Sequence, residues 1–230
     1  RSVPTLATVL KGAGYATGMV ANSGDISRAW GFQEGFDWFT CLQPRGVLGA
    51  TESASRLRLY RRLVQAWRRH APSRRSEDYY RPAGDVLVEA ERFVAANLAQ
   101  GNRWFAVAHL EEPHTPWFSH ATSGEAIGPT WPPAPGIGDE AAAKALYQGE
   151  VRALDDALGL SLTRLRESGA LDDAIVVVVG SHGAALGERG VWWHGEDLSD
   201  PQLHVPLIIR FPTATLAGSR ATWAVRVMDV

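Results

Sequence analysis

The sequence predicts an α/β fold, a doubly wound, mixed and mostly parallel sheet with helices on both faces. Segments with helical spacing of apolar residues alternate along the chain with short apolar or β-branched runs, an order typical of parallel sheets with crossover helices. The run 174–179 is apolar throughout, which favours a strand buried on both faces of a parallel sheet. With 230 residues, 45% of them hydrophobic, the chain can bury a sizeable core. We expect one domain over 1–230.

The first elements are a helix and a strand. A helix begins after Ser2, its expected cap, and Gly12 and Gly14 stop it. A strand over 15–21 and a loop rich in glycine and aromatic residues over 22–39 follow.

The later elements continue the alternation of helix and strand. They are helices over 85–99 and 139–168, strands over 104–110, 174–179 and 205–211, and loops over 119–138 and 180–201.

Composition excludes several classes of protein. The formal net charge is −2 and the pI is about 6.4, which argues against a nucleic-acid partner. The apolar run 175–179 is far too short to span a bilayer. A single cysteine, Cys41, excludes an internal disulfide framework and a cysteine-based zinc cluster. Arginines cluster over 56–75, where apolar residues at helical spacing predict an ordinary surface helix rather than a membrane or phosphate contact.

Two polar clusters follow predicted strands. The strand 104–110 runs into Glu111, Glu112 and His114, and the strand 174–179 runs into Ser181 and His182, with His194 further along the same loop. Sites in doubly wound sheets form at the carboxyl ends of the strands. The two clusters therefore predict a site for an anionic or metal-bound substrate, with His114, His182 and His194 converging on one edge of the sheet.

Six segments along the chain have the character of family motifs. They are PTLATVLKGAGYAT at 4–17, GFQEGFD at 31–37, HLEEPHTP at 109–116, Tyr147 with EVRALD at 150–155, VVVVGSHGAALGERG with WHG at 176–195, and VPLII at 205–209. Together, in this order and over nearly the whole chain, they resemble the motifs of the sulfatase family of the alkaline phosphatase superfamily.

The resemblance implies a metal-dependent hydrolase of sulfate esters, acting on a small molecule or a glycan. In that family a divalent cation, most often Ca²⁺, neutralises the anionic ester and a formylglycine attacks it. It implies that His114 contacts substrate or acts as an acid or base, that His194 is a cationic substrate ligand, and that His182 and Ser181 lie in the metal-side segment.

Departures from the family pattern leave two alternatives. The family's nucleophile motif and aspartate pair precede the first helix, so we expect a fragment truncated at both ends that does not hydrolyse an aryl sulfate alone. Ser181 replaces a metal-ligand aspartate, which Glu188 or Asp197 would have to compensate, and we expect no stoichiometric calcium or magnesium site. Cys41 is out of place for the nucleophile, so we expect it to be structural. The alternatives are a phosphonate or phosphate ester hydrolase, or a non-catalytic binder of anionic ligands.

Overall fold

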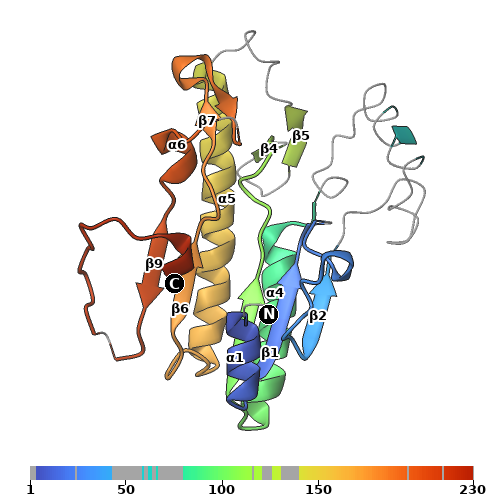
Figure 1. The fold of residues 1–230 in the computed structure, drawn as a ribbon, viewed down its shortest axis with the longest axis vertical. Helices are drawn as coiled ribbons and strands as arrows, with labels where there is room; N and C mark the ends of the chain where they lie inside the picture. Colours follow the sequence, from blue (N-terminus) through green and yellow to red (C-terminus); the bar gives the residue numbers. More distant parts are fainter. Residues whose placement is uncertain are drawn as a thin grey trace. The chain divides into compact units, whose positions relative to one another are not determined.

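The computed structural model describes residues 4–23, 25–42, 59, 62–63, 66, 80–115, 117–120, 126–130, 140–195, 197–213 and 215–229. The chain divides into two compact units. Their helices and strands are labelled in Figure 1. The first unit contains Arg1–Pro132 and Ala145–Arg164, and the second contains Pro133–Lys144 and Leu165–Val230. The expectation of one domain stays a prediction.

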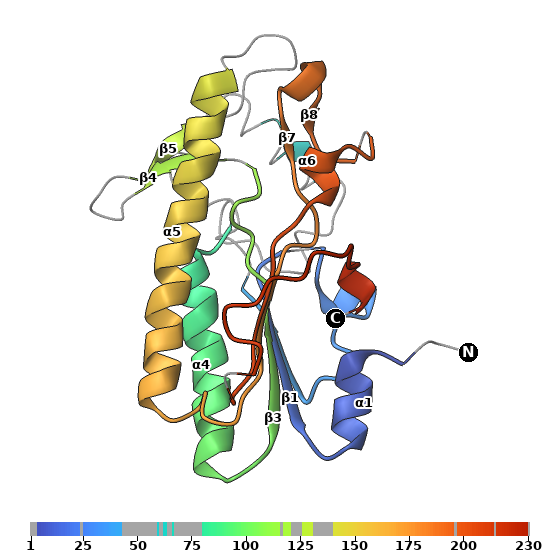
Figure 2. The ribbon, with the colours of Figure 1, turned by 90° about the vertical axis from the view of Figure 1, so that its left-hand side faces the viewer.

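A parallel sheet forms the centre of the first unit. Its strands β1 (Ala16–Ala21), β2 (Trp38–Cys41) and β3 (Trp104–Ala108) lie in the order β2-β1-β3. Both neighbours of β1 are parallel to it, with Gly18 opposite Trp38 on one side and Ala106 on the other. Figure 2 shows α1 and α4 on opposite faces of this sheet. Parallel strands with helices on both faces confirm the predicted α/β class.

Helix α1 (Leu6–Gly12) begins one turn later than expected. Its cap is Thr5, whose side-chain oxygen accepts a hydrogen bond from the Thr8 N–H at 3.1 Å. The expected cap, Ser2, lies outside the described residues. A threonine at this position satisfies one of the amides that the first turn leaves without an intrahelical partner.

Helix α4 (Ala83–Ala99) packs on the sheet through an aromatic contact. The Phe93 ring stacks on Trp38 of β2 with ring centroids 5.4 Å apart. It also lies against Gly18 of β1, where an added Cβ would come within 2.7 Å of the ring. A glycine at that point of the strand is therefore what lets the helix approach the sheet.

A small apolar cluster covers part of the sheet. Met19, Ala21 and Phe39 are its buried members, and Cys41 packs against them. The Cys41 thiol donates to the Ser23 carbonyl at 3.3 Å. Cys41 therefore has a packing role in the described structure, as expected.

The remaining elements of the first unit include a ribbon that the sequence did not indicate. Strands β4 (Trp117–His120) and β5 (Ala126–Thr130) pair antiparallel, although most of this stretch falls in the predicted loop 119–138. The short helix η1 (Arg28–Trp30) follows β1.

Helix α5 (Glu140–Glu167) matches its predicted bounds closely. Its residues 145–164 belong to the first unit, where Arg164 binds Glu91 of α4 through two hydrogen bonds of 2.7 Å. A planar guanidinium pairs with a carboxylate in this bidentate way.

The second unit contains an antiparallel strand pair. Strand β6 (Val176–Val179) pairs with β9 (Leu207–Arg210), with Val177 opposite Ile209. The expectation that 174–179 is buried on both faces of a parallel sheet was wrong for the described residues. Its partner is antiparallel, and Val177 and Val179 are each 40% exposed. A β-branched run is compatible with either pairing direction, so composition could not distinguish them.

The chain between β6 and β9 holds short elements within the predicted loop 180–201 and just beyond it. They are β7 (Ala185–Leu186), η4 (Glu188–Gly190), β8 (Trp192–Trp193) and α6 (Asp200–Leu203), and η5 (Val227–Asp229) follows later.

Composition also bears on the arginine-rich segment 56–75 and on membrane-spanning helices. Most of the arginine-rich segment 56–75 lies outside the described residues. In the part of the chain that the structure describes, no helix combines the length and the hydropathy needed to cross a bilayer.

Candidate functional site

Two histidine rings lie side by side in the second unit. His182 follows β6 and His194 follows β8, and their ring centroids are 4.1 Å apart with the planes tilted by 37°. The β7–β8 hairpin explains this proximity, because Ala185 pairs with Trp193 and the chain returns to the place where it left. Both rings are exposed. The pair therefore presents two imidazoles to a ligand from one short stretch of chain.

A carbonyl fixes the orientation of the His182 ring. Its Nδ1 lies 2.9 Å from the carbonyl oxygen of Gly183. A carbonyl oxygen can only accept, so Nδ1 donates and Nε2 is the acceptor nitrogen of the neutral ring. Protonation at Nε2 would add a second donor, which suits an anionic ligand.

His114 has the same local arrangement in the first unit. It follows β3, and its Nδ1 donates to the carbonyl of the next residue, Thr115, at 2.8 Å. The Glu111 carboxylate lies 3.8 Å from the same nitrogen and would balance the charge of a protonated ring. The His114 side chain is 38% exposed, so a ligand can reach it.

A buried tryptophan anchors the segment that carries His114. Trp117 is 0% exposed, and its indole N–H donates to the Pro113 carbonyl at 2.9 Å. Its ring meets Tyr147 of α5 edge-on, with centroids 5.8 Å apart. A buried indole with its N–H satisfied holds the chain firmly on both sides of His114.

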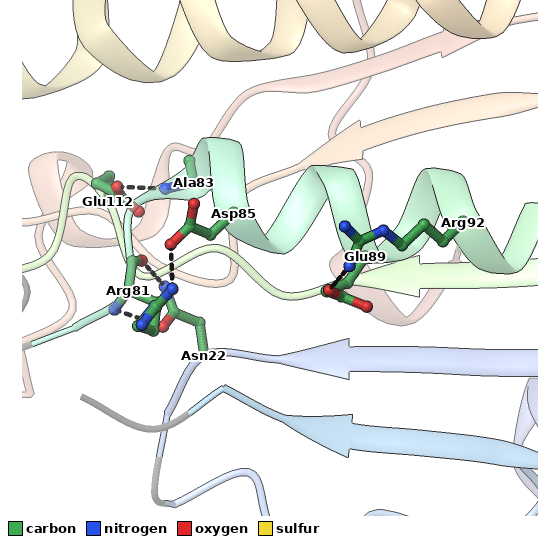
Figure 3. Close-up of polar contacts among 7 residues, drawn as sticks. All are labelled: Asn22, Arg81, Ala83, Asp85, Glu89, Arg92 and Glu112. Carbon is green, nitrogen blue, oxygen red and sulfur yellow. Dashed lines mark hydrogen bonds and ion pairs between the residues drawn. The ribbon is translucent and has the colours of Figure 1, made fainter. Parts of the chain in front are cut away.

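Polar contacts tie the carboxyl ends of β1 and β3 to the amino end of α4 (Figure 3). Glu112, beyond β3, accepts from the Ala83 N–H at 2.7 Å. Asn22, directly after β1, accepts from the Arg81 N–H at 2.9 Å and donates to the Arg81 carbonyl. A carboxylate at a helix N-terminus satisfies an orphan amide and meets the positive end of the helix dipole. These contacts form a connected polar layer between the ends of β1 and β3 and the start of α4.

This layer contains two buried acids and a buried phenol. Burial raises the pKa of Glu112 to about 7, and the charges of Glu150 and Glu111 add to the rise against hydrogen bonds from the main chain. Glu150 is fully buried and accepts from the Tyr80 hydroxyl at 3.3 Å. Burial, together with the Glu150 charge, also raises the pKa of Tyr80. Nearby, burial lowers the pKa of His109. Sequence reasoning quoted Glu112 and Glu150 in motifs but gave them no role.

The described residues do not make a metal site. They bring together no group of three His, Cys, Asp or Glu side chains that could hold an ion. Ser181 is exposed. Glu188 accepts from the Leu186 N–H and lies 3.3 Å from the Lys144 ammonium, and its pKa is lowered, since these contacts outweigh burial. Asp197 accepts from Ser199 and Gln202, and the Ser199 contact is the main reason that its pKa is lowered. Among the described residues, neither acid contacts Ser181.

The structure brings some predicted site residues together. His182 and His194 are neighbours, with Ser181 directly before the first in the chain. His114 belongs to the other unit, and the convergence of all three histidines stays a prediction. Sequence reasoning missed Gln202, a buried amide whose side chain contacts the segment after His194.

One family model matches almost the whole chain, and several solved structures are similar to it in fold. The family model named Sulfatase matches residues 1–229. The lipoteichoic acid synthase LtaP from Listeria monocytogenes is similar in fold, with a TM-score of 0.56 and 15% identity over 92% of this chain and 47% of that one. A protein of the alkaline phosphatase superfamily from Vibrio parahaemolyticus has a TM-score of 0.50 and 19% identity over 90% of this chain and 41% of its own.

A third similar structure contains a sulfated sugar. It was solved in complex with its substrate, D-glucosamine-2-N,6-O-disulfate, and has a TM-score of 0.52 and 16% identity over 91% of this chain and 55% of its own. The chain therefore spans only about half the length of these structures. A comparison with curated protein sequences finds no match.

Proposed function

We propose, from the premise that this chain belongs to the sulfatase family, that the protein hydrolyses a sulfate ester, with His114 and His194 as the residues that contact the substrate. The observation that carries the proposal is the close pair of His182 and His194. Both lie on the segment 180–206 between β6 and β9, called the excursion below. His114, beyond β3, is the second contribution of this chain.

The chemistry of the ester explains why imidazoles suit this task. A sulfate ester is negatively charged, and more negative charge develops on the leaving oxygen as its bond to sulfur breaks. Protonated imidazole donors stabilise such charge, and a positioned imidazolium can give its proton to the leaving oxygen. In His114 and His182, Nδ1 lies within hydrogen-bond distance of a main-chain carbonyl, which fixes how each ring is oriented.

The family is associated with a divalent cation and a formylglycine, but neither is assigned to residues of the described chain. No three potential ligands come together in the described residues, and a serine hydroxyl at 181 brings no charge. We infer a sulfated sugar or other small sulfate ester as substrate. The similar structure with a disulfated glucosamine supports the sugar.

Two alternatives have their own support. The first is hydrolysis of a phosphate or phosphonate ester, which the likeness in fold to a protein of the alkaline phosphatase superfamily supports. The exposed Ser181, with no carboxylate in its place, favours a protein that binds anionic ligands without cleaving them.

Hydrolysis of matched aryl esters by the product of the whole reading frame tests the proposal. We expect aryl sulfate to be cleaved faster than aryl phosphate. In His114→Ala and His194→Ala, kcat/KM should fall about 10²- to 10⁴-fold, since each removes a donor or proton source. His204→Ala is the matched control. His204 is an exposed histidine on the same excursion, and its Nδ1 lies 3.8 Å from the Asp200 carboxylate.

The outcomes separate the three functions. Faster cleavage of the phosphate would replace the proposal with the first alternative. Saturable binding of a sulfate ester without product release would favour the second. Equal activity of wild type and both histidine variants would refute the assignment of the two residues.

A further inference from the structure

We propose that Gln202 is the positioning residue that holds His182 and His194 side by side. Gln202 lies on α6 and bonds to the main chain of Gly183 and Gly195, the residues that follow the two histidines. It therefore acts through the backbone and not through the imidazoles. The catalytic consequence rests on the proposed function. The structural inference itself does not.

Gln202 contacts both histidine segments. Its side-chain Oε1 accepts from the Gly195 N–H at 2.8 Å, directly after His194. Its main-chain carbonyl accepts from the Gly183 N–H at 2.8 Å, directly after His182. One residue therefore fixes the chain next to each ring. Gln202 is only 4% exposed, so water has little access to its side of both bonds.

Both ends of the side-chain amide are used. The Nε2 group donates to Asp197 Oδ1 at 2.6 Å while Oε1 faces the Gly195 N–H. An N–H only donates and a carboxylate only accepts, so these partners allow one orientation of the amide. Asp197 also accepts from the Ser199 N–H at 3.0 Å, which fixes the carboxylate in turn. An apolar residue of the same length could make neither bond.

Close backbone packing joins the His182 segment to α6. A Cβ on Gly183 would fall on the carbonyl oxygen of Pro201, so only glycine permits this approach. On the other side, Trp193 has a φ of 72°, a conformation that residues with a side chain seldom adopt without restraint. The hairpin and the Gln202 bond to Gly195 lie on either side of His194 and supply that restraint.

Preorganisation is the expected benefit. An exposed histidine on a loop samples several rotamers and backbone states, and ordering two of them during the reaction would slow it. Fixing both backbones in advance leaves only the side-chain torsions to settle.

Nuclear Overhauser contacts between the two imidazoles test the inference without any substrate. In wild type, the ring protons of His182 and His194 should show a cross-peak, since their centroids are 4.1 Å apart. Gln202→Met keeps the side-chain length and the main-chain bond to Gly183 but loses the side-chain bonds to Gly195 and Asp197. In this variant we expect loss of that cross-peak, an upfield shift of the Gly195 amide proton and faster exchange of that proton. Leu203→Ala, on the same helix and with a 57% exposed side chain, is the control that should keep the cross-peak.

A second variant protects the test against misfolding. Asp197→Ala changes an exposed residue and removes the partner that orients the amide, so the cross-peak should weaken even if Gln202→Met does not fold. An unchanged cross-peak in Asp197→Ala, or in a folded Gln202→Met whose Gly195 amide has shifted, would overturn the proposal.

Kinetics add a readout that depends on the proposed function. If the product of the whole reading frame cleaves a sulfate ester, Gln202→Met should lower kcat by roughly 10- to 100-fold, since misplaced groups lose much of their advantage. If no ester is cleaved, the ring contact still decides whether Gln202 positions the pair, so the two proposals can fail separately.

Discussion

Glu112 is a carboxylic acid buried at the amino end of α4, with its pKa raised to about 7. The unfolded chain releases this proton near 4.5, whereas the folded protein keeps it until about 7. Between these values the folded state binds more protons than the unfolded state, so the free energy of unfolding falls as the pH rises. The loss reaches about 3 kcal/mol above pH 7.

Denaturant unfolding of Glu112→Gln from pH 4 to 8 measures this effect. The amide is neutral at every pH and can still accept from the Ala83 N–H. We expect the variant to become more stable relative to wild type as the pH rises, by about 3 kcal/mol in total. Asp85→Asn, at a nearby but exposed carboxylate, is the control. A difference that does not change with pH would show that the Glu112 carboxyl ionises normally.

At the scale of single residues, the sequence shows which side chains have suitable chemistry for a site, but not which residues they contact. His182 and His194 could be named because histidines after strands form sites, and the structure places them together. Gln202 could not be named, because its role depends on a buried side chain meeting the Gly195 amide across a turn of the chain. Burial of the Glu112 carboxyl depends likewise on the position of α4, which local pattern does not determine.

Helix α5 carries Gly149 in its interior, and an added Cβ there would meet nothing within 4 Å. Gly149→Ala should therefore stabilise the protein by about 0.5–1 kcal/mol, since alanine loses less backbone entropy in a helix. Thermal unfolding followed by circular dichroism should show a rise in Tm of roughly 1–4 °C.

Gly18→Ala is the matched substitution in a strand. Its Cβ would collide with the Phe93 ring, so we expect a loss of about 1–3 kcal/mol by the same assay. Equal effects of the two substitutions would contradict the close approach of α4 to β1.

At the scale of elements, length separates what could be predicted from what could not. The long helices α4 and α5 repeat their apolar pattern over several turns, and their bounds were predicted within a few residues. Strand β2 and the pairs β4–β5 and β7–β8 are only two to five residues long. Such runs carry too few residues for a periodic signal, and partners distant in sequence decide their pairing.

Metal dependence can be tested on the molecule as a whole. An ion bound only by the folded state at 100 times its Kd would stabilise it by about 2.7 kcal/mol. For a chain of this length that corresponds to a rise in Tm of roughly 5–10 °C. Because the neutral hydroxyl of Ser181 brings no charge to a hard cation, we expect the same Tm in calcium and in a chelator. Ser181→Asp is the comparison variant. A calcium-dependent rise in the Tm of wild type would refute the expectation. A rise only in Ser181→Asp would show that the missing carboxylate at position 181 is what prevents calcium binding.

The pairing of β6 with β9 closes a single excursion of the chain. The Gly180 N–H donates to the Pro206 carbonyl at 3.0 Å, so the excursion starts and ends at one point, and it contains His182, His194 and Gln202. Insertions and exchanges within it need not disturb the strands that support it. Because the segment 180–206 leaves and rejoins the strand pair at one point, we expect its exchange for the matching segment of another family member to leave the β6–β9 pairing intact.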